Sequence, residues 1–186
     1  MKKYIPYGRQ DISSEDIKSV EDILKSDFLT QGQAVPEFEK ALNNLCKSKF
    51  STVMSSATAA LHIACKALDL GPGDIMWTSP ISFVASANCA LYCGAKVDFV
   101  DIDPLSNNMS IKALEEKLIH AESLNALPKV VIPVHLAGLS ADMAAISSLS
   151  KKYNFKIIED ASHAIGGTYN GEPIGNCMYS DICIFS

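Results

Sequence analysis

The feature that most restricts the fold is an alternation, from residue 51 onward, of short apolar runs with stretches of helical periodicity. Two of the runs, residues 129–134 (KVVIPV) and 156–160 (KIIED), carry their apolar residues consecutively. Consecutive apolar residues are typical of parallel strands that helices cover on both faces, whereas half-exposed antiparallel strands alternate apolar and polar residues. The sequence therefore predicts an α/β fold built on a parallel sheet.

Six strands are expected, at residues 51–54, 75–79, 96–100, 129–134, 156–159 and 181–186. Helical patterns lie between them, for example Met143, Ile146, Leu149 and Tyr153. Residues 166–171 are interpreted as a small hairpin, since the Asn170-Gly171 pair tolerates the positive φ angles of a tight turn. We see no linker or internal repeat, so residues 51–186 are interpreted as one domain.

Residues 1–50 are interpreted as a separate helical segment. The stretch Ser13-Ser14-Glu15-Asp16 is a suitable capped start for a helix, and Ile17, Val20, Ile23 and Leu24 follow at helical spacing. A second helical pattern contains Phe38, Leu42 and Leu45, and the non-periodic residues 26–32 join the two.

Composition excludes several classes of function. The 186 residues carry a net charge of -5, and the basic residues are scattered, which argues against a nucleic-acid partner. The N-terminus lacks the apolar core of a signal peptide, and no run approaches the ~18 apolar residues of a membrane helix, so we expect a cytoplasmic protein without a membrane partner. The six cysteines lack CxxC spacing, which favours reduced core thiols over disulfides or a zinc site, and no metal site is predicted.

Ligands of parallel α/β sheets bind beyond the carboxyl ends of the strands, so the residues there are the candidates. Residues 55–61 (SSATAAL) follow the first expected strand and lead into a helix with small side chains. Free backbone N–H groups and the positive end of the helix dipole would suit a phosphate. Simple N-capping by Ser55 or Ser56 explains the same pattern.

Two other strand ends carry unusual residues. Phe83 stands where a helix begins and could stack on a planar ligand, although this residue taken alone favours a core phenylalanine. Asp160 ends an apolar strand and would be partly buried, which is costly unless a cation or several hydrogen bonds meet it. A protonated pyridine nitrogen would be such a cation, and His163, one turn further on, could touch the same ligand. The alternative is a helix N-cap beside a structural histidine; Glu159 points to the opposite side of the strand.

Six segments together resemble the DegT/DnrJ/EryC1/StrS family of sugar aminotransferases, which depend on pyridoxal 5'-phosphate (PLP). They are residues 28–32 (FLTQG), 56–61 (SATAAL), 78–85 (TSPISFVA), 133–138 (PVHLAG), 159–164 (EDASHA) and 184–186 (IFS), and the likeness extends from Tyr7 to Ser186. The resemblance implies the large domain of a fold-type-I, aspartate-aminotransferase-like PLP enzyme, a three-layer α/β/α structure without the small C-terminal domain.

The resemblance also implies an activity and residue roles. It is greatest to the branch that transfers an amino group, from an amino acid such as glutamate, to the C4 keto group of a UDP-4-keto-6-deoxy-N-acetyl-hexosamine in pseudaminic acid biosynthesis. The implied cofactor residues are Ala57, Thr58 and Ser186 at the phosphate, Phe83 on the ring face, Asp160 at the ring nitrogen and His163 beside the ring. The implied nucleotide-sugar contacts are Tyr7, Asp27, Phe28, Leu29 and Thr30. Residues 1–50 would serve substrate and dimer contacts, and residues 51–186 would bind PLP within a homodimer.

In this family a Schiff-base lysine follows the Phe-Ser pair by a few residues, and no lysine of this sequence stands at a matching position. That lysine is therefore expected downstream of Ser186, and no catalytic residue is assigned within the chain. Because such a lysine tethers the cofactor and moves the proton, the 186-residue chain alone is expected to be inactive.

Three alternatives stay open. The same family contains PLP-dependent sugar dehydratases, in which a histidine replaces the lysine. A non-catalytic fragment that forms a partner surface is the second. The third is a metal-dependent glycosyltransferase, because Asp101-Ile102-Asp103 matches a DxD pattern, although the residues that follow, Pro104 and Ser106-Asn107-Asn108, favour a polar turn.

Overall fold

The structure is a computed structural model that describes residues 9–186, so Tyr7 lies outside the described part of the chain. Its helices are α1 (Ser14–Leu24), α2 (Ala34–Cys46), α3 (Ala57–Ala67), α4 (Ala85–Tyr92), α5 (Ile111–Ser123), the short 3-10 helix η1 (Leu136–Gly138) and α6 (Met143–Tyr153). Its strands are β1 (Ile75–Thr78), β2 (Lys96–Phe99), β3 (Val130–Ile132), β4 (Lys156–Asp160), β5 (Thr168–Tyr169), β6 (Glu172–Pro173) and β7 (Ile182–Ile184).

Five strands form one parallel sheet in the order β2-β1-β3-β4-β7. The chain moves outward from β1 to β2 and then returns to the other side of β1 with β3. This reversal is a topological switch point, and ligands of open α/β sheets bind beyond the carboxyl ends of the strands at such a point. The predicted α/β class with a parallel sheet is confirmed.

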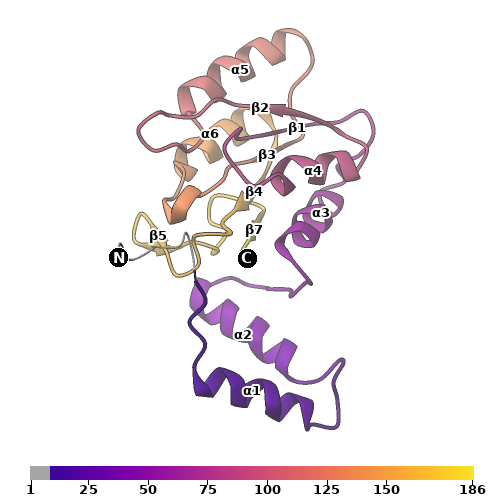
Figure 1. The fold of residues 1–186 in the computed structure, drawn as a ribbon. Coiled ribbons are helices and arrows are strands. Elements are labelled where there is room, and N and C mark those ends of the chain that lie inside the picture. Colours follow the sequence, from indigo (N-terminus) through magenta and orange to yellow (C-terminus); the bar gives the residue numbers. More distant parts are fainter. Residues whose placement is uncertain (1–8) are drawn as a thin grey trace, which may run out of the picture.

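Helices cover both faces of the sheet, in three layers (Figure 1). On one face α3 and α4 pack against alternate strand residues such as Ile132 and Ile158. On the other face α5 and α6 pack against the residues in between, such as Val131 and Ile157. Since side chains alternate along a strand, Asp160 continues the row of Ile158, and Glu159 continues the row of Ile157.

The strand predicted at residues 51–54 is absent, and that prediction is wrong. The polar groups of this segment bond to side chains of α2 instead of to a neighbouring strand: the Val53 N–H donates to Glu39 Oε1 (2.9 Å) and the Ser51 hydroxyl donates to Asn43 Oδ1 (2.6 Å). A strand needs a partner for its backbone groups, and no strand in residues 9–186 pairs with this segment.

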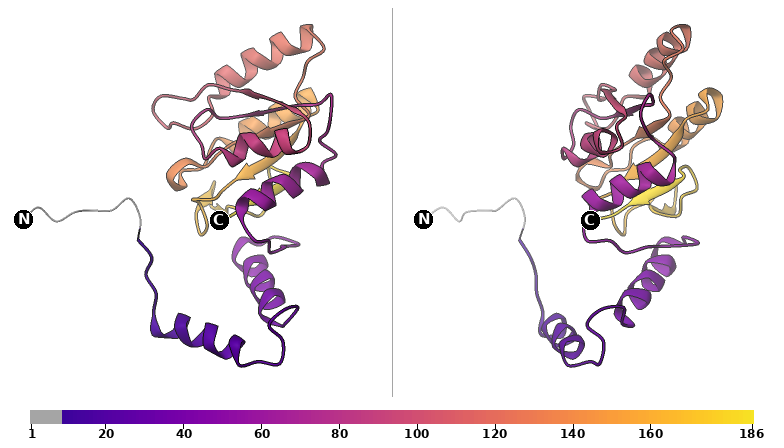
Figure 2. Two further views of the ribbon diagram at one scale, coloured as in Figure 1. Left: turned by 45° about the vertical axis from the view of Figure 1, so that its right-hand side comes forward. Right: turned by 90° about the vertical axis from the view of Figure 1, so that its right-hand side faces the viewer.

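The predicted helices of the N-terminal segment are confirmed, and they form an arm that extends away from the sheet (Figure 2). Ser13 caps α1 as predicted, with its hydroxyl accepting from the Asp16 N–H (3.2 Å) and its own N–H donating to Asp16 Oδ2 (2.8 Å). No residue of α1 is buried. The apolar stripe along α1 therefore faces solvent in this chain.

The hairpin predicted at residues 166–171 is present as β5 and β6, with Asn170 and Gly171 both at positive φ in the turn. All six cysteines are free; four of them are buried, as predicted for core thiols, whereas Cys177 and Cys183 are partly buried. Burial raises the pKa of the Cys183 thiol well above its ordinary value, and the nearby Glu159 charge adds to the shift. No helix in residues 9–186 is both long and apolar enough to cross a membrane.

Gly175 joins the hairpin to the rest of the fold at a point where a side chain does not fit. Its φ is +97°, and a Cβ atom there would lie 2.7 Å from Phe185 Cζ and 3.0 Å from Cys46 Sγ. We expect Gly175→Ala to lower the free energy of unfolding by about 2–4 kcal/mol, from left-handed strain plus overpacking.

Chemical denaturation of a protein of the same length as its relatives measures this loss, and Gly166→Ala is the matched control. Gly166 also has a positive φ (+77°), but a Cβ atom there meets nothing within 4 Å. The control should therefore lose only the strain of about 1–2 kcal/mol. Equal losses in the two variants would contradict the packing argument.

Candidate active site

The Asp160 carboxylate lies buried at the carboxyl end of β4, with 4% of the residue exposed. Its Oδ2 accepts from the Ser86 hydroxyl (2.6 Å), and its Oδ1 accepts from the Ser162 hydroxyl (2.7 Å) and the Ser162 N–H (3.3 Å). No lysine, arginine or histidine of residues 9–186 forms an ion pair with it. The site thus holds an oriented, buried negative charge that a cationic ligand would neutralise.

Ser86, on α4, is the main residue that the sequence analysis missed. It is fully buried, and because it donates to Asp160, its oxygen accepts from the Ser82 hydroxyl (2.6 Å). The buried residues of α4 are Ala85, Ser86, Cys89 and Ala90. Small residues let α4 approach the sheet closely, and the four-residue spacing of Ser82 and Ser86 was the available signal.

Phe83 lies in the loop between β1 and α4 and is 74% exposed. The core interpretation of this phenylalanine is therefore wrong. Phe83 directly follows Ser82, whose hydroxyl bonds to Ser86, and the Ser86 hydroxyl in turn donates to Asp160. Such a ring is free to stack on a planar ligand.

The N-terminus of α3 offers backbone donors. Ser56 is the N-cap, and its hydroxyl accepts from the Ala59 N–H (3.2 Å). The N–H groups of Ala57 and Thr58 have no acceptor among the described residues, as expected for the first turn of a helix. The capping and phosphate interpretations are therefore compatible, because the cap occupies a different N–H group from the two that remain free.

A groove of about 800 Å³ brings Ala57 and Ser186 together. Its walls come from α2, the segment before α3, α3 itself and β7. Ser186 follows β7 directly and is exposed, so its hydroxyl is available at the same end of the sheet as the first turn of α3. This arrangement fits a phosphate that receives backbone donors from one side and a hydroxyl from the other.

His163 lies in the turn after β4 and is exposed. Its Nδ1 accepts a hydrogen bond from the Ala137 N–H (3.3 Å), which belongs to η1. The backbone is close here as well, because a Cβ atom at Gly138 would lie 3.0 Å from the His163 carbonyl oxygen. The structure therefore joins the turns that follow β3 and β4.

The residues expected at the nucleotide sugar are not gathered at this site. Asp27, Phe28, Leu29 and Thr30 lie in the connection between α1 and α2, and all four are exposed. Figure 1 shows that this connection lies at the far end of the arm, away from the carboxyl ends of the strands. Within one chain, these four residues and Asp160 therefore belong to separate regions.

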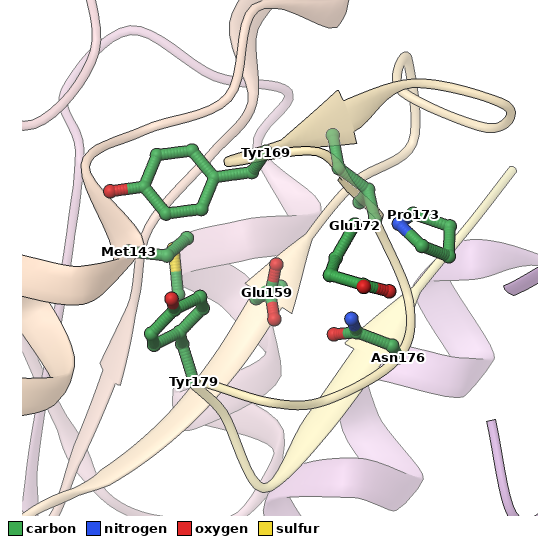
Figure 3. A pocket seen from close by; sticks show the side chains of 8 residues that line it. Met143, Glu159, Tyr169, Glu172, Pro173, Asn176 and Tyr179 are labelled. Carbon is green, nitrogen blue, oxygen red and sulfur yellow. The ribbon is translucent and has the colours of Figure 1, made fainter. Parts of the chain in front are cut away.

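The opposite face of β4 carries a second polar group. Figure 3 shows Glu159 pointing into a small cavity, with Tyr169 and Tyr179 on one side and Glu172 and Asn176 on the other. The cavity volume of about 10 Å³ is of the size of one water molecule. Glu159 does not face Asp160, as strand alternation predicted.

The DxD sequence forms a turn. Asp103 Oδ1 accepts from the Leu105 N–H (3.0 Å), the Ser106 N–H (2.9 Å) and the Ser106 hydroxyl (3.1 Å). Asp101 Oδ1 accepts from the adjacent Ile102 N–H (2.8 Å). The polar-turn interpretation is confirmed, and within residues 9–186 no group of three acidic, histidine or cysteine residues is arranged for a metal ion.

Comparison with known proteins identifies relatives of this chain. A UDP-4-amino-4,6-dideoxy-N-acetyl-beta-L-altrosamine transaminase of Campylobacter jejuni is 42% identical over 98% of this chain and 46% of its own length. A UDP-4-amino-4-deoxy-L-arabinose--oxoglutarate aminotransferase of Shewanella sediminis is 38% identical over 99% of this chain and 45% of its own length. The chain thus spans about half the length of the curated relatives it matches.

Solved structures give the same result. PseC of Helicobacter pylori, an aminotransferase involved in the biosynthesis of pseudaminic acid, superposes with a TM-score of 0.89 at 32% identity, over 99% of this chain and 48% of its own. The putative sugar aminotransferase Spr1654 of Streptococcus pneumoniae, with PLP and PMP forms, gives 0.85 at 30% identity, over 98% and 48%. The model of the DegT/DnrJ/EryC1/StrS aminotransferase family matches residues 10–186. This chain therefore belongs to the DegT/DnrJ/EryC1/StrS aminotransferase family.

Proposed function

We propose that this chain forms the PLP-binding part of an aminotransferase that acts on a nucleotide sugar. The observation that carries the proposal is the buried Asp160 carboxylate, which two serine side chains orient and no cation of residues 9–186 neutralises. A negative charge beside a pyridine nitrogen raises the pKa of that nitrogen and so favours its protonated form. The charge and the place of Asp160 therefore fit the PLP ring.

The other residues fit the remaining parts of the cofactor. Ala57 and Thr58 would donate their free N–H groups to the phosphate, and Ser186 would add its hydroxyl. Phe83 would cover one face of the ring, and His163 would lie beside it. When bound, PLP takes up the electron pair left behind when the amino-acid donor loses its α proton. The chain's own contribution is to hold the cofactor and to keep the Asp160 carboxyl group oriented.

We propose a UDP-4-keto-6-deoxy-N-acetyl-hexosamine as the sugar substrate. The support is the 42% identity to the Campylobacter jejuni transaminase, which is named for a UDP-4-amino-4,6-dideoxy-N-acetyl sugar. The Shewanella sediminis relative is named for a UDP-4-amino-4-deoxy pentose and for oxoglutarate, which supports glutamate as the amino donor. Retention of the transferred amine on C4 distinguishes this activity from a sugar dehydratase of the same family.

A homodimer would explain the arm, and we propose that residues 1–50 serve contacts with a second copy and with the substrate. Large apolar side chains on the arm are exposed, including Val20 (61%), Phe28 (68%) and Leu29 (64%). Exposed apolar groups of this density are typical of interaction surfaces. In such a dimer, Asp27, Phe28, Leu29 and Thr30 of one copy could contact a sugar bound at the other copy.

The test is an amino-transfer assay on a protein of the same length as its relatives. With PLP and glutamate, we expect UDP-4-keto-6-deoxy-N-acetyl-hexosamine to yield a 4-amino sugar and one equivalent of 2-oxoglutarate, and no product to form without PLP. Mass spectrometry of the sugar measures the outcome. A UDP-4-keto-pentose is the competing substrate, and preferential amination of it would contradict the hexosamine proposal. Loss of a hydroxyl without retention of nitrogen would indicate a dehydratase.

A further inference from the structure

Glu159 and His135 form a buried pair on the face of the sheet opposite Asp160. His135 is fully buried and Glu159 is 5% exposed. His135 Nε2 lies 2.8 Å from Glu159 Oε2, and the Ser180 hydroxyl donates to Glu159 Oε1. Two buried polar side chains at this depth are costly unless their hydrogen bonds are complete, and here the bonds tie β4 to the turn after β3.

The donors around the His135 ring assign its tautomer. The Ala141 N–H donates to Nδ1 (3.2 Å), so Nδ1 carries a lone pair and no proton. Nε2 of the neutral ring must then carry the proton, and it donates to Glu159. Glu159 thus accepts the hydrogen bond from His135 Nε2, and this leaves Nδ1 free to accept from the Ala141 N–H.

These bonds close the loop of residues 135–141. The His135 N–H donates to the Asp160 carbonyl (3.0 Å) at one end, and the ring holds Ala141 at the other. Asn108 fastens the middle, since its Oδ1 accepts from the Leu136 N–H (3.0 Å) and its Nδ2 donates to the Leu139 carbonyl (2.9 Å). Ala137, between these points, has a φ of +53°, which a non-glycine residue adopts only where its surroundings hold it.

The strained residue is the one that contacts the candidate active site. The Ala137 N–H donates to His163 Nδ1 (3.3 Å), so the neutral His163 ring carries its proton on Nε2. We propose that Glu159 is a positioning residue: through His135 it holds the loop of residues 135–141, and this loop fixes the orientation and tautomer of His163. The relevance of His163 to amino transfer rests on the proposed function, whereas the positioning does not.

Two substitutions at Glu159 separate the acceptor from the charge. Glu159→Gln keeps a carbonyl oxygen for His135 Nε2–H, so it should preserve the loop. Glu159→Met keeps the length of the side chain and removes the acceptor, so it should release His135. Tyr169→Phe is the matched control, because the Tyr169 hydroxyl donates to Asp142 (2.7 Å) on the same side of the sheet and makes no hydrogen bond to His135 or His163.

The readouts are taken on the protein without cofactor, in mildly alkaline buffer where histidine rings are neutral. Long-range proton–nitrogen NMR of the histidine rings, assigned with His163→Gln, reports the His163 tautomer. We expect a single Nε2–H tautomer in the wild type, Glu159→Gln and Tyr169→Phe, and a mixture in Glu159→Met. Hydrogen exchange of the Ala137 amide should become about tenfold faster or more in Glu159→Met alone, because the loop opens locally.

Amino transfer by the holoenzyme is the second measurement. We expect turnover to fall by about 10- to 100-fold in Glu159→Met, and to stay within about threefold of the wild type in Glu159→Gln, since a displaced active-site group has effects of this order. A changed His163 tautomer with unchanged turnover would contradict the role proposed for His163 and leave the positioning inference standing.

Folding is checked first by thermal melts. If Glu159→Met does not fold, Glu159→Asp replaces it, because the shorter side chain withdraws the carboxylate from His135 and keeps the charge. If Glu159→Met or Glu159→Asp folds and leaves both the His163 tautomer and the hydrogen-exchange rate of the Ala137 amide unchanged, the inference is overturned. Failure of both variants to fold, while Glu159→Gln and Tyr169→Phe fold, would assign Glu159 a purely structural role and overturn it as well.

Discussion

Asp160→Ala is expected to lower amino transfer by about 10²–10³-fold or more while the protein stays folded, because it removes a preorganised charge from a buried site. The carboxylate is the negative charge that keeps the cofactor nitrogen protonated in the proposed function. The variant is made in a protein of the same length as its relatives. Turnover, PLP affinity and the thermal melt are measured together, so that a chemical loss is distinguished from unfolding.

Asp160→Asn sharpens this prediction, since its amide oxygen can still accept from Ser162, its amide nitrogen would face the Ser86 hydroxyl oxygen, and the charge is lost. We expect it to lose nearly as much activity as alanine. Asp101→Asn is the matched control: this carboxylate also follows a strand of the sheet, but it is exposed, and within residues 9–186 its one hydrogen bond is from the adjacent Ile102 N–H. Near-normal turnover in both Asp160 variants would remove the central assignment of the site.

Residues 1–186 expressed as an isolated polypeptide are expected to be poorly soluble or to melt without cooperativity, and to bind PLP weakly. The sheet order leaves one edge of β7 without a neighbouring strand among the described residues. Apolar side chains such as Phe38, Leu42 and Ile63 line the open groove beside it. Unpaired backbone groups and uncovered apolar surface both favour aggregation over the compact state. Ala57 lines the same groove, so the phosphate site should be loose as well.

The comparison is with a protein of the same length as its relatives, prepared and measured side by side. Thermal melts and visible spectra with added PLP are recorded, and borohydride reduction followed by mass spectrometry locates any lysine that carries the cofactor. No lysine of residues 9–186 makes a hydrogen bond or ion pair with Asp160, Ser86 or His163, so we expect no specific attachment in the short chain. A cooperative melt of the short chain would contradict the argument from the unpaired edge of β7, and a single modified lysine in it would contradict the argument that no lysine of this chain holds the cofactor.

Some of this structure could be predicted from the sequence, because its causes are local. Ser13 and Asp16 are three residues apart and cap α1 directly. Asn170 and Gly171 are adjacent and accept the φ angles of the hairpin turn, and the spacing of Met143, Ile146, Leu149 and Tyr153 predicted the buried face of α6 correctly. The position of Asp160 at the end of an apolar strand likewise indicated a buried carboxylate before its partners were known.

Other features depended on neighbours that are distant in the sequence. Residues 51–54 have the composition of a strand, but a strand forms only where another strand pairs with it, and α2 side chains bond to this segment instead. Ser86 lies 74 residues from Asp160, and only the close packing of α4 on the sheet brings the two together. The spatial separation of Asp27–Thr30 from the carboxyl ends of the strands also follows from the direction of the arm, which no local pattern indicates.

The sequence by itself determined the α/β class, most of the strands and helices, and the strand ends that carry the candidate cofactor residues, because periodicity and turn chemistry act between near neighbours in the chain. Only the tertiary structure decided which strand ends lie together and what each polar group bonds to. Strand alternation predicted that Glu159 and Asp160 face opposite sides, but the partners, His135 for one and Ser86 for the other, follow from the order of strands and the packing of helices. Buried hydrogen bonds of this kind join residues far apart in the chain, so their geometry is fixed only when the sheet assembles.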